Sequence, residues 1–221
     1  MKLYSAPLSL FSRKVEIALR EKAITFEREM VPFTQAQGYE PRHPVVLAVN
    51  PKRQVPVLID GDLELFDSTL IFEYLEDLRP SPPLYPVDFR MRARCRLLEL
   101  IGDEVLAPRA IRLGYRTEPP DSDARKQEQR DDDGRQAEAE IAELYSDLAQ
   151  RLGAADFFGG DFSYADIALF MAVLWVMRLS GPRLDAWPEL ARWYARVGAR
   201  PSVAVAAAEL AAADRELSPP L

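Results

Sequence analysis

The sequence predicts an α/β domain followed by an all-helical domain, and three observations support this prediction. Strand and helix signals alternate over fewer than 80 residues at the start of the chain. Four prolines then cluster between Pro80 and Pro86, where a domain boundary is expected. Beyond them only the helical period of apolar residues continues. We therefore predict a first domain at 1–79, a proline-rich linker at 80–87 and an all-helical domain at 88–221.

The first half of the first domain has the pattern β-α-β. Lys2–Ser5 predicts a short strand, and the apolar stripe within Phe11–Lys22 predicts an amphipathic helix. The alternation of apolar and polar residues in Phe26–Val31 is typical of a strand. Residues 32–50 predict an irregular stretch with at most one short helix.

The second half of this domain has the pattern β-β-α. Val57–Ile59 and Leu63–Leu65 flank Asp60-Gly61-Asp62, and a glycine that accepts positive φ favours a tight hairpin there. Asp67–Thr69 offers side chains that cap a helix, and Leu70–Leu78 continues as that helix. Six elements are therefore expected before the linker.

Helical periodicity dominates the rest of the chain. The predicted helices lie at about 88–115, 124–152, 163–179, 187–198 and 202–214. The third is the most apolar and begins with a capping box, for which we expect a structural role without chemistry.

Composition and charge narrow the class of protein. The formal net charge of −7, without a basic run that alternates with aromatics, argues against direct binding of nucleic acid. The single cysteine, Cys95, provides neither an intramolecular disulfide nor a metal-ligand framework, so we expect no metal site. We see no secretory signal and no apolar run of ~18 residues, so we expect a cytoplasmic protein without a membrane partner.

Four local patterns together resemble the soluble glutathione transferases, with features of the bacterial, zeta-like and omega-like members. The patterns are Ser9–Val15, Asn50–Leu58, Leu65–Ile71 and the C-terminal pair Phe162–Asp166 with Trp187–Val203. The resemblance covers nearly the whole chain. It implies an α/β N-terminal thioredoxin-like domain (βαβ–ββα) plus an all-α C-terminal helical domain, with glutathione as the cosubstrate.

The resemblance implies that the hydroxyl of Ser9 donates to the sulfur of glutathione. From the residues alone, Ser9 reads equally well as a helix N-cap. Ser5 is the main competitor for the catalytic role, and Tyr4 in the first strand is a further alternative. Because Ser9 and Ser12 stand where thioredoxins carry cysteines, a dithiol redox cycle is excluded on chemical grounds.

Two further segments are assigned to the tripeptide by the resemblance. It implies a cis Val55-Pro56 bond, with the backbone of Val55 paired to the cysteinyl residue of glutathione. Asp67 would hold the γ-glutamyl ammonium, and Ser68 with the free N–H groups of its helix would hold the carboxylate. From the residues alone, Asp67 and Ser68 are equally typical of a helix cap. The remaining candidates for contact with glutathione are Phe11 through its backbone, Arg42, His43 and Gln54.

The predicted function is conjugation of glutathione to small electrophiles in detoxification, or a related glutathione-dependent isomerisation. We expect the acceptor pocket between Ala6–Leu10 and the helices that carry Arg109, Arg112, Tyr115 and Trp175. The alternative is a non-catalytic binding protein. Asp67–Arg79 followed by Pro82–Pro86 also resembles the stringent starvation proteins, which act by binding RNA polymerase.

A homodimer is expected from the first helix after the linker. This helix has more apolar side chains than a single domain contact needs. Those side chains are Met91, Leu97, Leu98, Ile101 and Val105.

Overall fold

The computed structural model of the chain describes residues 1–34, 37–40 and 42–218. These residues form two compact units, one built from Met1–Tyr85 with the segment from Arg200 onward, the other from Pro86–Ala199. The domain boundaries drawn from the sequence stay a prediction.

The first unit contains a four-stranded mixed sheet in the order β2-β1-β3-β4. The strands are β1 (Lys2–Ser5), β2 (Glu27–Met30), β3 (Val57–Asp60) and β4 (Leu63–Phe66). β1 runs parallel to β2 and antiparallel to β3, and β3 and β4 form the predicted hairpin. The βαβ–ββα order expected from the sequence is confirmed.

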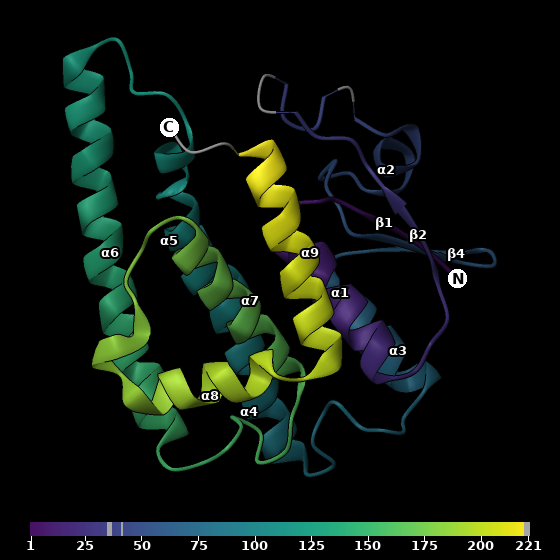
Figure 1. Cartoon of the computed structure of the whole chain (residues 1–221). Helices are drawn as coiled ribbons and strands as arrows, with labels where there is room; N and C mark the ends of the chain where they lie inside the picture. Colours follow the sequence, from purple (N-terminus) through teal and green to yellow (C-terminus); the bar gives the residue numbers. More distant parts are fainter. Residues whose placement is uncertain (35–36, 41, 219–221) are drawn as a thin grey trace. The chain divides into compact units, whose positions relative to one another are not determined.

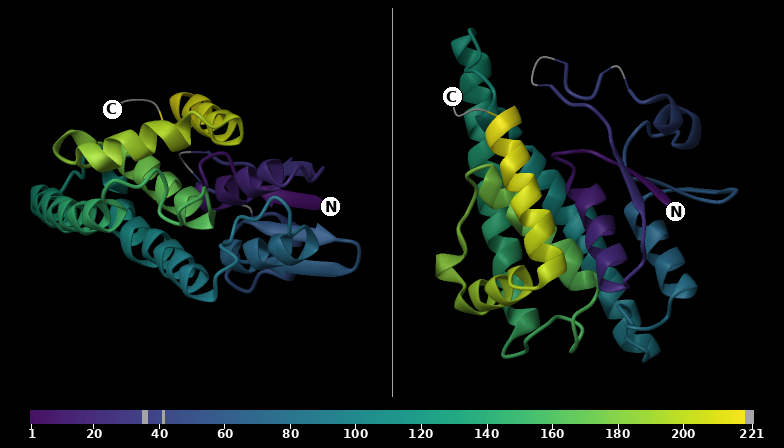
Figure 2. Two further views of the ribbon diagram at one scale, coloured as in Figure 1. Left: turned by 90° about the horizontal axis from the view of Figure 1, so that it is seen from below. Right: turned by 45° about the vertical axis from the view of Figure 1, so that its right-hand side comes forward.

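Helices complete this unit (Figure 1). α1 (Leu10–Glu21) connects β1 to β2, α2 (Pro44–Val49) is the short helix of the irregular stretch, and α3 (Ser68–Leu78) follows β4. The last helix, α9 (Pro201–Leu217), returns to this unit and packs on α1. α9 lies along α1 in each of the views (Figure 1, Figure 2). α1 also contacts α3, so it lies between α3 and α9 in the packing of this unit.

The core of this unit lies on both faces of the sheet. Tyr4 and Val57 pack with Val46 of α2 on one face. Because successive side chains of a strand point to opposite faces, their neighbours Leu3 and Leu58 lie on the other, and both are fully buried. The sheet is thus covered on both faces at β1 and β3.

The second unit begins with a helix that changes its winding. α4 (Phe89–Leu100) passes into the π-helical segment η1 (Ile101–Leu106) and then into α5 (Ala107–Ile111). The prediction of one regular helix over 88–115 was wrong in this respect. Pro108 has no N–H to donate to the preceding turn, so the regular hydrogen-bond ladder cannot continue there.

The remaining helices of this unit surround an apolar centre. They are the 3₁₀ turn η2 (Gly114–Thr117), α6 (Ala124–Leu152), α7 (Tyr164–Arg178), the 3₁₀ turn η3 (Leu184–Ala186) and α8 (Pro188–Gly198). α7 contacts α4, α5 and α8, and its side chains from Tyr164 to Val173 are buried. Its predicted capping box is present at Ser163 and Asp166. Within the described ranges, no helix has the length and apolar character needed to cross a membrane.

Candidate functional site

The sheet register brings three segments named in the sequence analysis to one edge of the first unit. Tyr4 of β1 lies opposite Val57 of β3, and Val57 lies opposite Phe66 of β4. β1 and β4 end at this edge and β3 begins there, since each pair is antiparallel. The residues that follow β1, precede β3 and follow β4 therefore gather at one end of the sheet.

Ser9 lies at this edge as the N-cap of α1. It has extended backbone angles, and its Oγ accepts a hydrogen bond from the backbone N–H of Ser12 at 3.2 Å. The Ser9 N–H donates to the carbonyl of Ala6, which closes a tight turn. The hydroxyl is half-buried and keeps its own proton for a further acceptor. The prediction that Ser9 is a helix N-cap is thus confirmed, and this role is compatible with a second role for the same hydroxyl.

The two alternatives to Ser9 have other surroundings. Ser5 is fully buried, and its hydroxyl donates to Glu16 Oε1 at 2.6 Å. Tyr4 belongs to the apolar core, with its ring centroid 5.1 Å from that of His43. The proton of Ser5 is therefore already used inside the protein.

Asp67 and Ser68 form the start of α3. Asp67 has a positive φ of 76°, a conformation that is costly for a residue with a side chain and that concentrates at functional positions. Its Oδ1 accepts from the N–H of Thr69 at 3.1 Å, while Lys52 Nζ lies 3.3 Å from Oδ2. The predicted cap is thus confirmed.

A buried lysine lies behind this helix start. Lys14 of α1 is fully buried and donates to Ser68 Oγ at 3.3 Å. Its ammonium also lies 5.0 Å from the ring centroid of Phe72 and 5.8 Å from that of Phe11. The positive charge adds to the positive end of the α3 dipole, so this helix start favours an anion.

The other candidates have local partners. Arg42 donates through Nε to Glu40, and His43 caps α2 by accepting the N–H of Val45 at 3.2 Å. His43 Nε2 also lies 2.8 Å from a carboxylate oxygen of Glu29. Gln54 is exposed and contributes only its carbonyl, which accepts from the side-chain amide of Asn50.

The Val55-Pro56 bond is cis, as the resemblance implies. Among the hydrogen bonds formed by the described residues, none uses the backbone N–H or carbonyl of Val55. The side chain of Val55 packs against the core of the first unit.

Cys95 of the second unit has a thiol of low reactivity. It is buried, and desolvation raises the pKa of its thiol to about 11, so the reactive thiolate is scarce at neutral pH. Across residues 1–34, 37–40 and 42–218, no group of three or more His, Cys, Asp or Glu side chains could hold a metal ion.

Comparison with protein families identifies the chain. The model of the glutathione S-transferase N-terminal domain matches residues 3–83, and that of the C-terminal domain matches residues 110–201. The chain belongs to the glutathione S-transferase family. The thioredoxin-like fold followed by an all-α domain, predicted from the sequence, is thereby confirmed.

Individual relatives match different shares of the chain. A stringent starvation protein A homolog of Coxiella burnetii is 42% identical over 100 residues, which make up 44% of this chain and 44% of that protein. The match thus spans less than half of the length of that relative. Two solved structures match over much more of the chain.

The first is a glutathione S-transferase from Rhodospirillum rubrum F11, with 28% identity and a TM-score of 0.75. The match covers 91% of this chain and 89% of that one. The second is a glutathione transferase homolog from sulfitobacter with bound glutathione, with 25% identity and a TM-score of 0.74. It covers 98% of each chain.

The charged residues of α1 next to the candidate site were not predicted from the sequence. Lys14 lies three residues after Phe11 and four before Ala18, on the predicted apolar stripe of the helix. A lysine in that register was a usable signal for a buried charge. Arg13 and Glu16 gave no such signal, because Arg13 pairs with Glu209, which is distant in sequence, and Glu16 pairs with Ser5 and Arg28 outside the helix.

Proposed function

We propose that this member of the glutathione S-transferase family binds glutathione and transfers it to a small electrophile. The observation that carries this proposal is the sheet register, which gathers Ser9, Val55 and the Asp67-Ser68 pair at one edge. A tripeptide that needs separate partners for its thiol, its backbone and its γ-glutamyl end fits such an edge. The sulfitobacter homolog with bound glutathione supports the choice of ligand.

Ser9 is the proposed partner of the glutathione sulfur. A free thiol titrates at ~8.5, so a largely ionised thiolate at pH 7 needs its pKa lowered by ~2 units, equivalent to ~2.7 kcal/mol. A hydrogen bond to a charged acceptor contributes ~1.5–3 kcal/mol, and a helix N-terminus adds ~0.3–1 kcal/mol. One hydroxyl at the start of α1 is therefore sufficient. Ser9 meets this need better than Ser5, whose proton goes to Glu16.

The start of α3 is the proposed anchor for the γ-glutamyl end. The carboxylate of that group would accept from Ser68 and the free N–H groups of the helix, with the charge of Lys14 behind them. Its ammonium would take the place of Lys52 beside Asp67. Lys52 is well exposed, so the ion pair that it gives up is a weak one.

The remaining contacts in this proposal are distributed along the same edge. The backbone of Val55 would pair with the cysteinyl residue, and the backbone of Phe11 would lie beside the peptide. Arg42 and His43 would reach the glycyl end only after leaving the local partners described above, whereas the exposed side chain of Gln54 would reach it directly.

In the proposed reaction the thiolate sulfur attacks an electrophilic carbon and forms a C–S bond. In a substitution, the bond to the leaving group breaks and its electron pair departs with that group. In an addition, the electron pair moves to the neighbouring atom, which then takes a proton from water. An isomerisation would use the same steps, with the C–S bond broken again at the end.

Two measurements test this proposal. The protein should be retained on glutathione–agarose and released by free glutathione, and it should conjugate glutathione to an activated aryl chloride. Retention without any conjugation of aryl chloride, enone or epoxide substrates would contradict the catalytic part. Failure to bind the column, together with no heat of binding in calorimetry, would contradict the whole proposal.

A second candidate is a non-catalytic binding protein with the same fold. The 42% identity to a stringent starvation protein A homolog over 100 residues favours it. In that case the partner would be a protein, with RNA polymerase as the first to test, and the bound thiol of glutathione would titrate as it does in free solution.

A further inference from the structure

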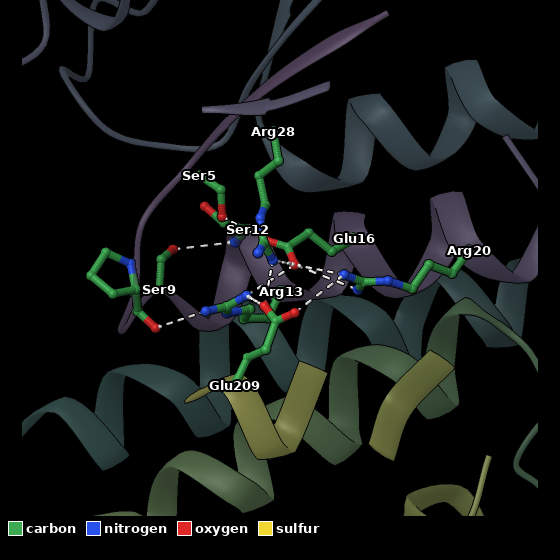
Figure 3. A network of polar contacts seen from close by, with 9 residues as sticks. Ser5, Ser9, Ser12, Arg13, Glu16, Arg20, Arg28 and Glu209 are labelled. Carbon is green, nitrogen blue, oxygen red and sulfur yellow. Dashed lines mark hydrogen bonds and ion pairs between the residues drawn. The ribbon is translucent and has the colours of Figure 1, made fainter. Parts of the chain in front are cut away.

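Five charged side chains lie close together beside α1, and we call them the α1 charge cluster (Figure 3). They come from three elements of the first unit, namely α1, β2 and α9. The members are Arg13, Glu16, Arg20, Arg28 and Glu209. Arg13 and Glu16 are almost completely buried, at 1% and 0% exposure.

Two guanidinium groups alternate with two carboxylate oxygens at the centre of this cluster. Arg13 Nη1 lies 3.0 Å from Glu16 Oε2 and 2.6 Å from Glu209 Oε2. Arg28 Nη1 lies 2.8 Å from the same oxygen of Glu16 and also donates to Glu209. Each carboxylate therefore keeps the two guanidinium groups together, and each guanidinium group keeps the two like-charged carboxylates together.

The same side chains hold the loop that carries Ser9. Glu16 accepts through Oε1 from the hydroxyl of Ser5, at the start of the loop. Arg13 donates through Nη2 to the carbonyl of Pro7 at 3.3 Å, two residues before Ser9. Figure 3 shows the Ser9 side chain on the same side of α1 as these contacts.

We propose that the α1 charge cluster positions Ser9, and that Glu209 of α9 is the positioning residue that keeps the cluster assembled. This inference rests on the proposed role of Ser9 in stabilising the glutathione thiolate. The C-terminal helix then contributes to thiolate formation through Arg13, without a contact of its own to the sulfur.

The physical reason is competition for acceptors. Without the carboxylate of Glu209, Arg13 and Arg28 share one buried oxygen of Glu16. Buried guanidinium groups do not stay unpaired, so the side chain of Arg13 turns toward a new acceptor. Its contact with the carbonyl of Pro7 is the longest of its hydrogen bonds, and we expect that contact to be lost first. The loop then gains freedom and the Ser9 hydroxyl moves off the sulfur.

The sign of one measurement separates this effect from simple electrostatics. Glu209→Gln removes a negative charge, which by itself favours an anionic sulfur and lowers the pKa of bound glutathione. Loss of the Ser9 hydrogen bond raises that pKa. The proposal therefore predicts that the pKa of bound glutathione rises in Glu209→Gln although a negative charge has been removed.

The experiment follows the ultraviolet band of the bound thiolate against pH in four forms of the full chain. These are the wild type, Glu209→Gln, Ser9→Ala and the control Glu21→Gln. Glu21 is the last residue of α1, at the opposite end of this helix from Ser9. It accepts hydrogen bonds from Arg200, the residue before α9. Both glutamates thus link α1 to the C-terminal segment, but only Glu209 is connected to the loop, through Arg13 and its contact with Pro7.

For Glu209→Gln we expect the pKa to rise by about 0.5–1 unit, which corresponds to a ~3–10-fold lower kcat near pH 7. The KM for glutathione should change less than about twofold, because the binding contacts lie at Val55 and α3. Glu21→Gln should leave both values unchanged. Glu209→Asp keeps the charge but is one methylene shorter, so it should also raise the pKa, and it replaces Glu209→Gln if that variant does not fold.

A pKa that falls or stays constant in the Glu209 variants, while Ser9→Ala raises it, would overturn the positioning role and leave the proposed function intact. An equal rise in Glu21→Gln would also overturn it, because any link to the C-terminal segment would then suffice. If Ser9→Ala does not move the titration, the proposed role of Ser9 fails and the positioning role fails with it.

Discussion

Two buried helices, α1 in the first unit and α7 in the second, differ in how many charged side chains they bury beside their apolar ones. α7 buries an apolar run with one carboxylate, Asp166, at its start. That carboxylate accepts from Ser163 twice and from the N–H of Phe158 and the indole of Trp193. α1 buries Arg13, Lys14 and Glu16 within its first two turns. Both helices are buried, but α1 carries three buried charged side chains in its first two turns and α7 carries one.

The difference lies in what the buried charges hold. Asp166 fixes the start of its own helix and the segments beside it, which is a structural task. The charges of α1 reach the Ser5–Ser9 loop, Ser68 and α9. Apolar residues of the same volume would often stabilise a fold as well as a buried ion pair, so the charges at α1 call for a reason beyond stability. Their position beside the candidate site provides one.

The largest expected effect is on the structural side of this comparison. Asp166→Ala leaves four hydrogen-bond donors without their acceptor inside the second unit, so the free energy of unfolding should fall by about 3–5 kcal/mol. Urea denaturation measures this change. Asp185→Ala, at an exposed ion pair with Arg183, is the control and should change the free energy by less than about 0.5 kcal/mol. A decrease of less than about 1 kcal/mol in the free energy of unfolding of Asp166→Ala would contradict the structural role of Asp166 in this comparison.

The next effect concerns the start of α3. Asp67→Ala should raise the KM for glutathione at least about tenfold, because a charge-assisted contact with the γ-glutamyl ammonium contributes ~1.5–3 kcal/mol. Steady-state kinetics with varied glutathione measures it. Asp67→Asn is the matched control, since it keeps an oxygen for the N–H of Thr69 but removes the charge. If Asp67→Asn behaves as the wild type, Asp67 serves only as a helix cap.

A third prediction uses α4, which exposes several apolar side chains, although Leu98 of the predicted dimer face is buried inside the protein. Phe89, Leu97 and Leu100 each expose about half or more of their surface. We expect a homodimer that covers part of this face, and Leu97→Glu should weaken it by about 1–2 kcal/mol. Sedimentation of the wild type as a 25 kDa species at micromolar concentration would contradict the dimer.

A smaller effect is expected in the pH dependence of stability. Partial burial raises the pKa of Glu209, but the hydrogen bonds and charges of Arg28 and Arg13 outweigh it, so the pKa lies below its ordinary value of 4.5. A lowered acid pKa in the folded state stabilises the protein above about pH 4.5, and this contribution is lost as pH falls through the folded-state value. Arg20 also faces this carboxylate, and Glu16 shares the guanidinium groups of Arg13 and Arg28 with it.

The corresponding measurement compares wild type and Glu209→Gln by urea denaturation between pH 7 and pH 3. The wild type should be more stable at pH 7, and the difference should shrink below about pH 4.5. A difference that stays constant to pH 3 would mean that Glu209 does not act through its charge.

Much of the fold could be predicted from the sequence because its signals are local. The hairpin depends on the turn at Gly61, the start of α7 depends on its capping box, and both were read from a few neighbouring residues. The π-helical segment η1 was not predicted, because it depends on how Pro108 interrupts an otherwise helical pattern. The predicted caps at Ser9 and Asp67 were confirmed for the same local reason.

The surroundings of the candidate site were less predictable. Glu209 lies 196 residues after Arg13, and no spacing rule connects them. The commitment of the Ser5 hydroxyl to Glu16 likewise depends on how α1 packs against β1. A sequence pattern shows which residues are able to do chemistry, whereas the fold decides which of their protons are already used.

The central claim is that the Ser9 hydroxyl stabilises the glutathione thiolate, and the titration of bound glutathione in Ser9→Ala tests it most directly. The account predicts that the pKa of the bound thiol rises by roughly 1–2 units and that kcat falls about 10–100-fold near pH 7, equivalent to ~1.4–2.7 kcal/mol. The affinity for glutathione should change little. An unmoved titration in Ser9→Ala, with a shift in Ser5→Ala or Tyr4→Phe instead, would contradict the account.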